Sequence, residues 1–335
     1  MTAPEAMHLI VPLWVAVGLA SYWGTKALIG LLTARAILDR PNERSSHDRP
    51  TPRGGGIAVI GALVPGWIAI ALLSGHARAA DLVVPAFAAA LAVLSWRDDR
   101  AGLPIGVRFA AQALAVVATL AVVPAITDGF DPFLQGWAGT VLVGLAWVWF
   151  INLYNFMDGI DGITGVETTS IGLGVVVVSA AAMMEWTLAA QGITAAAAAF
   201  GFLRWNRQPA RIFIGDVGSI PLGYLLGWLL LLLAARGQWA AALILPSYYL
   251  ADATLTLLRR AAKGERVWQA HRSHFYQRAV VAGLSHGQVT QRIAFANIGL
   301  IVAALIAVTG WTLTALAIAT VIVLALLILL ARGKP

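Results

Sequence analysis

The sequence predicts an all-α, polytopic membrane protein with about eleven transmembrane helices. Two observations support this fold class. Of the 335 residues, 59% are hydrophobic and only 12% are charged, and the mean hydropathy is +0.79. The apolar stretches with few charges are also each about the 20 residues that cross a hydrocarbon core as a helix. These values exclude a soluble enzyme, a disordered chain and a secreted scaffold held together by disulfides.

The spans are placed where apolar runs of sufficient length lie between polar connectors. In chain order they are expected at 7–32, 57–75, 82–95, 107–125, 136–153, 165–184, 187–203, 218–235, 239–257, 293–308 and 312–331. The last two follow from residues 293–331, which carry no charge and would form one helix of about 58 Å unless the chain turned back near Thr309 and Gly310. The chain is expected to be a single integral membrane domain, 1–335.

Long polar segments alternate with short connectors, so the long ones are expected on one side of the membrane. They are 34–56, 96–106, 154–164, 204–217 and 258–292. Together with Arg108 and the C-terminal tail they hold 20 of the 23 Lys and Arg residues. Because cytoplasmic loops retain Lys and Arg, the N-terminus is predicted to be periplasmic, and the C-terminus and any active site cytoplasmic. The net charge of +7 is then mainly an orientation signal and does not indicate nucleic acid.

The first polar motif is the segment 39–56, which ends in three glycines where a helix is expected to start. Glycines at a helix N-terminus permit close backbone approach to an anion. Arg53 and two further arginines could hold phosphate oxygens. A glycine-rich turn in a positively charged loop explains the same residues, and this alternative stays open.

The second motif is the pair Asp98 and Asp99 at the end of the third expected span. Adjacent carboxylates repel each other, which favours a bound cation, an arginine partner or one raised pKa. A solvated pair neutralised by Arg97 and Arg100 is equally consistent with the sequence.

The third and fourth motifs are rich in oxygen ligands. Asn152, Asn155 and Asp158 recur at every third position and would share one face of a helix, and Asp161 follows in a loop with no Lys or Arg. Asp216, between two glycines, precedes an apolar helix that it could N-cap. Carboxylates and amides suit Mg²⁺, which prefers oxygen ligands. Because the chain has no cysteine, a thiolate metal site is excluded.

The fifth motif contains His271 and His274, which would share a helix face. Without a third imidazole or thiol nearby, a phosphate or sugar contact is favoured over zinc. Asp252 is expected to be structural, as an ion-pair partner for the arginine-rich end of its own helix. His286 belongs to no such constellation and is expected at the surface.

Together, these strings resemble the polyprenyl-phosphate N-acetylhexosamine-1-phosphate transferase superfamily of membrane enzymes. The resemblance spans residues 39–278 and is carried by Asp39-x-Pro-Asn-x-Arg-Ser-Ser-His, Pro50-Thr-Pro-Arg-Gly-Gly-Gly, Asp98-Asp99, Asn152-x-x-Asn155-x-x-Asp158-Gly-x-Asp161-Gly, Phe213-x-Gly-Asp216-x-Gly-Ser219 and His271-Arg-Ser-His274. The peptidoglycan branch tends to carry consecutive histidines in its last loop. The spaced histidines here favour the branch that initiates O-antigen and other surface polysaccharides.

The resemblance implies transfer of an N-acetylhexosamine 1-phosphate, by default that of N-acetylglucosamine, from a UDP-sugar to undecaprenyl phosphate, with release of UMP. It implies Mg²⁺, with Mn²⁺ as the alternative ion, and a place in the bacterial inner membrane. It also implies roles for individual residues: catalysis by Asp98, Asp99 and Asp161, metal binding by Asp216 and Asp158, and substrate binding by Arg53, Asn152, Asn155, His271, Arg272 and His274. Direct attack by the lipid phosphate is favoured over a covalent aspartyl intermediate.

Two alternative functions and the oligomeric state stay open. A phospho-N-acetylmuramoyl-pentapeptide transferase of the peptidoglycan branch would use the same chemistry on another sugar. A polytopic transporter is disfavoured, because transporter sites lie near the bilayer midplane, often between repeats, whereas here the acids crowd one face and no repeat is evident. A homodimer is compatible with the sequence, which fixes neither the oligomeric state nor the sugar.

Overall fold

The computed structural model describes residues 3–41, 49–75, 78–123, 136–267 and 271–333. Within these residues the chain is almost entirely helical, with one short hairpin of β1 (Leu38–Asp39) and β2 (Thr51–Pro52). The longer helices are α1 (Ala3–Ala34), α2 (Gly56–Ser74), α3 (Ala79–Ala101), α4 (Ile105–Val122), α6 (Gly136–Phe156), α7 (Ile163–Ala181), α8 (Trp186–Asn206), α9 (Asp216–Leu233), α13 (His286–Val308) and α14 (Thr312–Arg332).

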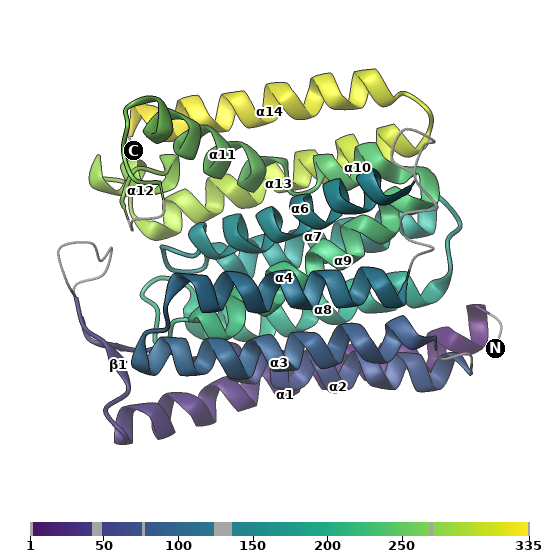
Figure 1. Ribbon diagram of the computed structural model, residues 1–335, viewed down its shortest axis with the longest axis horizontal. Coiled ribbons are helices and arrows are strands. Elements are labelled where there is room, and N and C mark those ends of the chain that lie inside the picture. Colours follow the sequence, from purple (N-terminus) through teal and green to yellow (C-terminus); the bar gives the residue numbers. More distant parts are fainter. Residues whose placement is uncertain (1–2, 42–48, 76–77, 124–135, 268–270, 334–335) are drawn as a thin grey trace.

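Ten stretches of the described residues are long and apolar enough to cross a membrane, so the expected all-α polytopic membrane fold is confirmed. The expected turn within 293–331 is also confirmed, because α13 ends at Val308 and α14 begins at Thr312. The helices run roughly parallel along the long axis of the molecule (Figure 1). The hairpin, the short helix α12 (Phe275–Val281) and the C-terminus lie at one end, which we call the α12 end, and the N-terminus lies at the other (Figure 1).

The segment 239–257, expected to be one membrane-spanning helix, is not a single helix. After α9 the chain passes through an irregular segment, η2 (Ala234–Gln238), in which Gly237 has φ 84°, and continues as α10 (Trp239–Ile244) and α11 (Ser247–Ala262). Pro246 lies at the break between α10 and α11, where it has no N–H to continue the helical hydrogen bonds. Neither α10 nor α11 is long enough to cross a membrane alone, and α9, η2 and α10 together form one of the ten stretches.

Helices α10 and α11 nevertheless carry the chain back towards the α12 end. At the far end of α9, Arg236 lies 3.6 Å from Glu185, in the connector between α7 and α8. On α11, by contrast, the ring of Tyr249 lies 5.2 Å from that of Tyr154, in the last turn of α6. The return pass is therefore made by two helices jointly, which explains why ten apolar stretches are found where eleven passes were expected.

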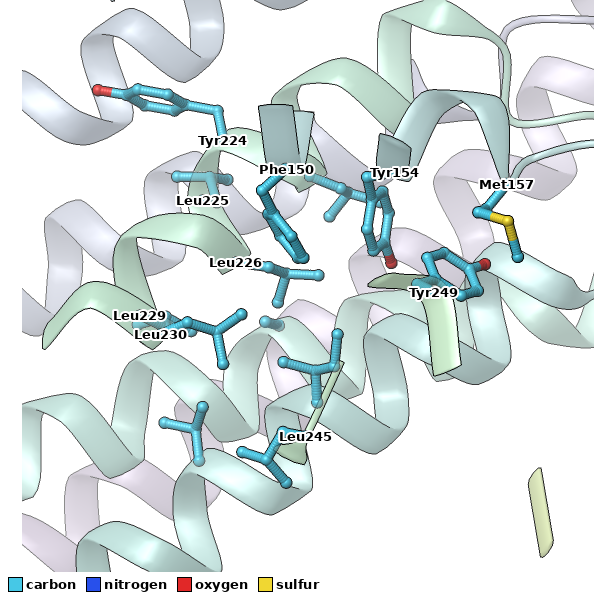
Figure 2. Packing of buried hydrophobic residues seen from close by; sticks show 14 of the residues in the cluster. Phe150, Tyr154, Met157, Tyr224, Leu225, Leu226, Leu229, Leu230, Leu245 and Tyr249 are labelled. Atoms are coloured by element: carbon cyan, nitrogen blue, oxygen red, sulfur yellow. The ribbon is translucent and has the colours of Figure 1, made fainter. Parts of the chain in front are cut away.

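Helix α9 is the centre of the bundle. Of its 18-residue apolar window, 83% is buried inside the protein, more than in any other span of the described residues. Phe150 and Tyr154 of α6 point towards Leu226 of α9 and Tyr249 of α11 (Figure 2). A hydrogen bond between buried groups also joins α6 to α9: the indole of Trp147 donates to the carbonyl of Tyr224 at 3.0 Å. This packing holds both ends of α9 in place, including the end at Asp216.

Candidate active site

The glycine triplet 54–56 joins the start of α2 to the segment before α9. The N–H groups of Gly54 and Gly55 donate to the carbonyl of Phe213 (3.0 and 2.8 Å), and that of Gly56 donates to Ile214 (2.9 Å). A Cβ on Gly56 would lie 2.2 Å from the Cα of Gly218, so only glycine permits this approach. These N–H groups are occupied by the chain itself, and the hypothesis of a glycine cradle for an anion is wrong. The same hydrogen bonds set Arg53 beside the start of α9.

The N-terminus of α9 is capped by a residue from another helix. Asp216 is the first residue of α9 and follows Gly215, whose backbone (φ 73°, ψ 171°) is accessible almost only to glycine. The Asp99 carboxylate of α3 accepts the N–H groups of Asp216 at 3.1 Å and of Val217 at 2.9 Å. The expected N-cap role of Asp216 is therefore wrong, because Asp99 takes the free N–H groups and the side chain of Asp216 is left to face other partners.

Two arginines link the aspartates of α3 and α9. Arg53 lies 2.8 Å from Asp99 and 2.9 Å from Asp216, and bridges them. Arg108, on α4, lies 3.0 Å from Asp98 and 3.6 Å from Asp216. Despite burial, which by itself lowers the pKa of Arg53, the nearby carboxylates raise its pKa above the ordinary value, so Arg53 stays a cation. From the sequence, Arg108 was counted only among the basic residues that indicate orientation. Its contacts with the aspartates were not predicted.

Asp158 lies just beyond the end of α6 and faces the same cluster. Its carboxylate accepts the hydroxyl of Thr164 at 2.5 Å. Burial raises the pKa of Asp158 to about 7, with smaller contributions that raise it from Asp216 and Asp99 and that lower it from Thr164 and Arg53. The cluster therefore gathers Asp98, Asp99, Asp158 and Asp216 from distant parts of the chain, and they face Arg53 and Arg108. When all four carboxylates are ionised they face two guanidinium groups, which leaves an excess of negative charge.

The donor set of this cluster is chemically suited to a hard divalent cation, because it consists of carboxylate oxygens with an uncompensated negative charge. No three His, Asp or Glu side chains of the described residues converge closely enough to enclose a metal ion by themselves. A cation held here would therefore need water or phosphate oxygens to complete its coordination shell, as is usual for Mg²⁺.

The two asparagines predicted to bind substrate lie on α6 at different depths. Asn155 accepts the hydroxyl of Ser219, on the first turn of α9, at 2.6 Å, which places it next to the cluster. Asn152 donates to Gln112 of α4 at 2.6 Å and is buried, so it ties α6 to α4. The expected shared helix face thus holds for the asparagines, whereas Asp158 lies beyond the last helical residue, Phe156.

Asp161 is oriented away from the cluster. Its carboxylate lies 3.2 Å from the imidazole of His286 at the start of α13, and accepts the N–H of Ala210 at 3.0 Å. No described contact joins Asp161 to Asp98 or Asp216. His286 is 7% exposed, so its expected surface position is wrong.

The predicted histidine segment lies at the same end of the bundle, on α12 and the residues before it. The rings of His271 and His274 are 4.8 Å apart, and Arg272 lies between them in the chain, half-buried. Burial, with His274 and Arg260, lowers the pKa of His271 to about 4, so its imidazole is neutral at pH 7. The hydroxyl of Tyr276 donates to the carbonyl of Phe156 at 3.0 Å, which fastens this segment to the loop that carries Asp158.

Asp252 does not pair with the arginines at the end of α11, as the sequence had suggested. Arg260 instead lies 2.7 Å from Glu265. Asp252 is fully buried and contacts the histidine segment, with His274 at 3.3 Å.

The sequence of the chain is similar to those of known proteins. The profile of glycosyl transferase family 4 matches residues 82–234, from α3 to the end of α9. A probable undecaprenyl-phosphate N-acetylglucosaminyl 1-phosphate transferase of Bacillus subtilis is 31% identical over 74% of this chain and 71% of its own length. An undecaprenyl-phosphate alpha-N-acetylglucosaminyl 1-phosphate transferase of Yersinia pestis is 29% identical over 82% of this chain and 76% of its own length.

A phospho-N-acetylmuramoyl-pentapeptide-transferase of Chlamydia muridarum is similar over less of the sequence, with 30% identity over 43% of this chain and 50% of its own length. The match to the Bacillus subtilis protein extends over most of both chains. The profile match includes Asp98, Asp99, Asp158 and Asp216 of the carboxylate cluster. On these grounds the chain belongs to glycosyl transferase family 4.

Proposed function

We propose that the chain transfers N-acetylhexosamine 1-phosphate, by default N-acetylglucosamine 1-phosphate, from a UDP-sugar to undecaprenyl phosphate. The product is undecaprenyl-diphospho-sugar, the first lipid-linked intermediate of O-antigen or another surface polysaccharide, and UMP is released. The observation that carries the proposal is the convergence of four carboxylates and two arginines at one end of a membrane bundle. The names of the relatives that match most of the chain support undecaprenyl phosphate as the acceptor and N-acetylglucosamine 1-phosphate as the transferred group.

The reaction joins two anions, so electrostatic repulsion is its main obstacle. A phosphate oxygen of the lipid forms a bond to the phosphorus that carries the sugar, and the bond from that phosphorus to the bridging oxygen breaks, so that UMP leaves. A phosphate monoester is largely a dianion at pH 7, since its second pKa is about 6, and it can attack without a strong base. This chemistry favours direct attack over an aspartyl intermediate.

The residues of the cluster have different proposed roles. Asp216 and Asp158 are the proposed ligands of Mg²⁺, with Mn²⁺ as the alternative, and the bound ion would neutralise negative charge on the diphosphate. Arg108 is one-third exposed and lies between Asp98 and Asp216, which suits it to contact a phosphate oxygen. Asp98 accepts Arg108 and the N–H of Leu103 at 2.6 Å, so it orients that arginine beside the reacting phosphates.

The remaining predicted residues support this cluster from the sides. Asp99 holds Arg53 and the start of α9, and therefore acts by positioning Asp216. Asn155, which contacts Ser219, and the segment from His271 to His274, which Tyr276 joins to the loop that carries Asp158, are proposed to bind the nucleotide and sugar. Asp161, which was predicted to be catalytic, has a scaffold role in this proposal, because its carboxylate serves Ala210 and His286.

We place the protein in the bacterial inner membrane with the α12 end in the cytoplasm, the N-terminus in the periplasm and the C-terminus in the cytoplasm. The support is the excess of Lys and Arg in the connectors at that end. UDP-sugars are cytoplasmic metabolites, and the cluster must face the compartment that supplies them. The ion pair of Glu185 with Arg78 (2.9 Å) would then lie at the periplasmic end.

The deciding experiment incubates the detergent-purified protein with undecaprenyl phosphate, Mg²⁺ and a panel of UDP-N-acetylhexosamines, and measures UMP release. The panel includes UDP-N-acetylmuramoyl-pentapeptide, so that the peptidoglycan reaction is tested in the same assay. Asp216→Asn should lose most activity and show a weaker dependence on Mg²⁺, whereas Glu185→Gln, at the opposite end, should turn over like the wild type. Folded protein that releases no UMP with any donor would refute the proposal and revive a transport function.

A further inference from the structure

Asp252, on α11, is a buried carboxylate outside the cluster described above. Its side chain is fully buried. A charge in this position is costly unless it is fully hydrogen-bonded. Asp252 meets this demand with five contacts: it accepts the N–H groups of Phe275 (2.9 Å) and Tyr276 (3.2 Å), the hydroxyls of Tyr248 (3.1 Å) and Thr256 (3.3 Å), and lies 3.3 Å from Nδ1 of His274.

The contact with His274 determines which ring nitrogen carries hydrogen. An ionised carboxylate can only accept, so the hydrogen bond requires the proton on Nδ1 of His274. The other ring nitrogen, Nε2, has no hydrogen-bond partner among the described residues. The side chain of His274 is 2% exposed, and Nε2 is the ring nitrogen left to bind a ligand, as an acceptor when the ring is neutral and as a donor when it is protonated. Asp252 is compatible with both forms, since Nδ1 keeps its proton in each.

The same carboxylate fixes the backbone around His274. The N–H groups of Phe275 and Tyr276 belong to the first turn of α12, which otherwise has no acceptor for them. Tyr276 in turn donates to the carbonyl of Phe156 and packs against Gly159, where an added Cβ would lie 2.2 Å from its hydroxyl. A chain of contacts thus runs from Asp252 through α12 to the loop that carries Asp158.

The charged groups around α12 do not provide a substitute for Asp252. The guanidinium of Arg259 lies over the ring of Phe275 at 4.8 Å, and that of Arg278 lies 5.8 Å from it. Both are cations, which cannot accept a hydrogen from Nδ1. Among the described residues, Asp252 is the acidic side chain in hydrogen-bonding contact with His274.

From this geometry we infer that Asp252 is a positioning residue of the transfer reaction: it holds His274 in one tautomer and ring orientation, with Nε2 directed to the phosphate or sugar of the UDP-sugar. The inference rests on the proposed function and assigns a task within it to a residue that touches neither substrate. If the role of Asp252 were purely structural, its loss would lower activity equally whether or not residue 274 is a histidine. The two roles are separable by experiment.

The test is a double-mutant cycle measured by UMP release. Asp252→Asn keeps the shape, but its amide can donate to Nδ1 and so stabilise the wrong tautomer. We expect kcat/KM for the UDP-sugar to fall by about 10- to 100-fold, as when a metal-bound histidine loses the partner that orients it. In a His274→Gln background the same change should cost less than about threefold, because the group that Asp252 orients is already gone.

The matched control is Tyr248→Phe, which removes a hydrogen bond to the same carboxylate without touching His274. It should lower the thermal midpoint but leave kcat/KM within about threefold of the wild type. If Asp252→Asn cannot be purified as a folded protein, Asp252→Glu takes its place in the cycle, because it keeps the charge but moves the carboxylate out of register with Nδ1.

The outcomes separate this inference from the proposed function. A wild-type protein that releases no UMP defeats the function itself. With an active wild type, undiminished activity of Asp252→Asn overturns the positioning role. Equal losses in the wild-type and His274→Gln backgrounds overturn it too, since the effect would then be structural and independent of His274.

Discussion

The neighbouring residues Asp98 and Asp99 should respond differently to the same chemical change. Each is replaced in turn by asparagine, which keeps the shape but removes the charge and one acceptor oxygen. Asp99 accepts from three donors: the N–H groups of Asp216 and Val217 and the guanidinium of Arg53. Its side chain is 2% exposed, so water cannot replace what is lost.

The size of the effect follows from these contacts. In either amide orientation, asparagine at position 99 turns its NH₂ group towards at least one of the three donors. The loss of one hydrogen bond to a charged group costs about 1.5–3 kcal/mol, and a buried donor left unpaired adds about 1–3 kcal/mol. Asp99→Asn should therefore destabilise the protein by about 3–5 kcal/mol.

The cost at position 98 should be smaller. The side-chain oxygen of asparagine can still accept the N–H of Leu103, and Arg108, which is 32% exposed, can turn to water and remains 3.6 Å from Asp216. The expected loss is about 1 kcal/mol, typical of a partly exposed ion pair. Asp98→Asn should thus lose activity with little loss of stability, whereas Asp99→Asn should lose both.

The assay is the thermal midpoint of each detergent-purified variant, measured beside UMP release under identical conditions. Glu185→Gln is the control, because it removes a carboxylate from an exposed ion pair at the opposite end of the bundle. Equal midpoints for the Asp98 and Asp99 variants would refute the capping role of Asp99. A lower midpoint for Asp98→Asn than for Asp99→Asn would show that the two assignments are reversed.

Three further predictions concern single positions. Gly215→Ala should abolish activity and lower the thermal midpoint, because φ is 73° and the added Cβ would lie 2.7 Å from an oxygen of Asp99; a fully active variant would contradict the packing at the start of α9. Glu167 of α7 accepts the amide of Asn297 at 2.8 Å, while its other oxygen and the amide oxygen of Asn297 have no hydrogen-bond partner among the described residues. Glu167→Gln should therefore keep or raise the stability of the protein, because glutamine supplies an N–H that the Asn297 oxygen can accept. A lower thermal midpoint would count against this pairing. The pKa of His271 is lowered to about 4, so as the pH falls the unfolded chain takes up a proton on this imidazole before the folded protein does. Stability should therefore fall as the pH drops from 6.5 towards 4. His271→Gln should flatten this pH dependence of the thermal midpoint, and an unchanged slope would contradict it.

The passes of the chain could be predicted because each is a local property of composition and length. The turn between α13 and α14 followed from the length of one uncharged stretch. The break at Pro246 did not, because hydropathy does not reveal where a proline interrupts the hydrogen bonds of an otherwise apolar run. That Asp98, Asp158 and Asp216 lie at one end of the bundle followed from the alternation of spans, which needs no knowledge of how helices pack.

The partners of the charged groups could not be predicted in the same way. Arg108 reaches Asp98 because α3 and α4 are joined by a short turn, and reaches Asp216 because α9 packs beside them. Asp99 caps α9 because α3 crosses its start at the right height. Crossing heights of this kind depend on the packing of side chains between helices, and a sequence pattern shows only which residues share a face of one helix.

Asp158 and Asp161 show why spacing alone does not place a side chain. The interval of three residues places side chains together only while the chain stays helical, and α6 ends at Phe156. Beyond that point Tyr276 packs against Gly159, and the backbone turns so that Asp158 faces Thr164 while Asp161 faces His286. One acid therefore joins the excess negative charge that a divalent cation would neutralise, and the other holds α13 against the loop. Within a single motif, the end of a helix decides which carboxylate joins the cluster and which one binds the neighbouring loop and helix.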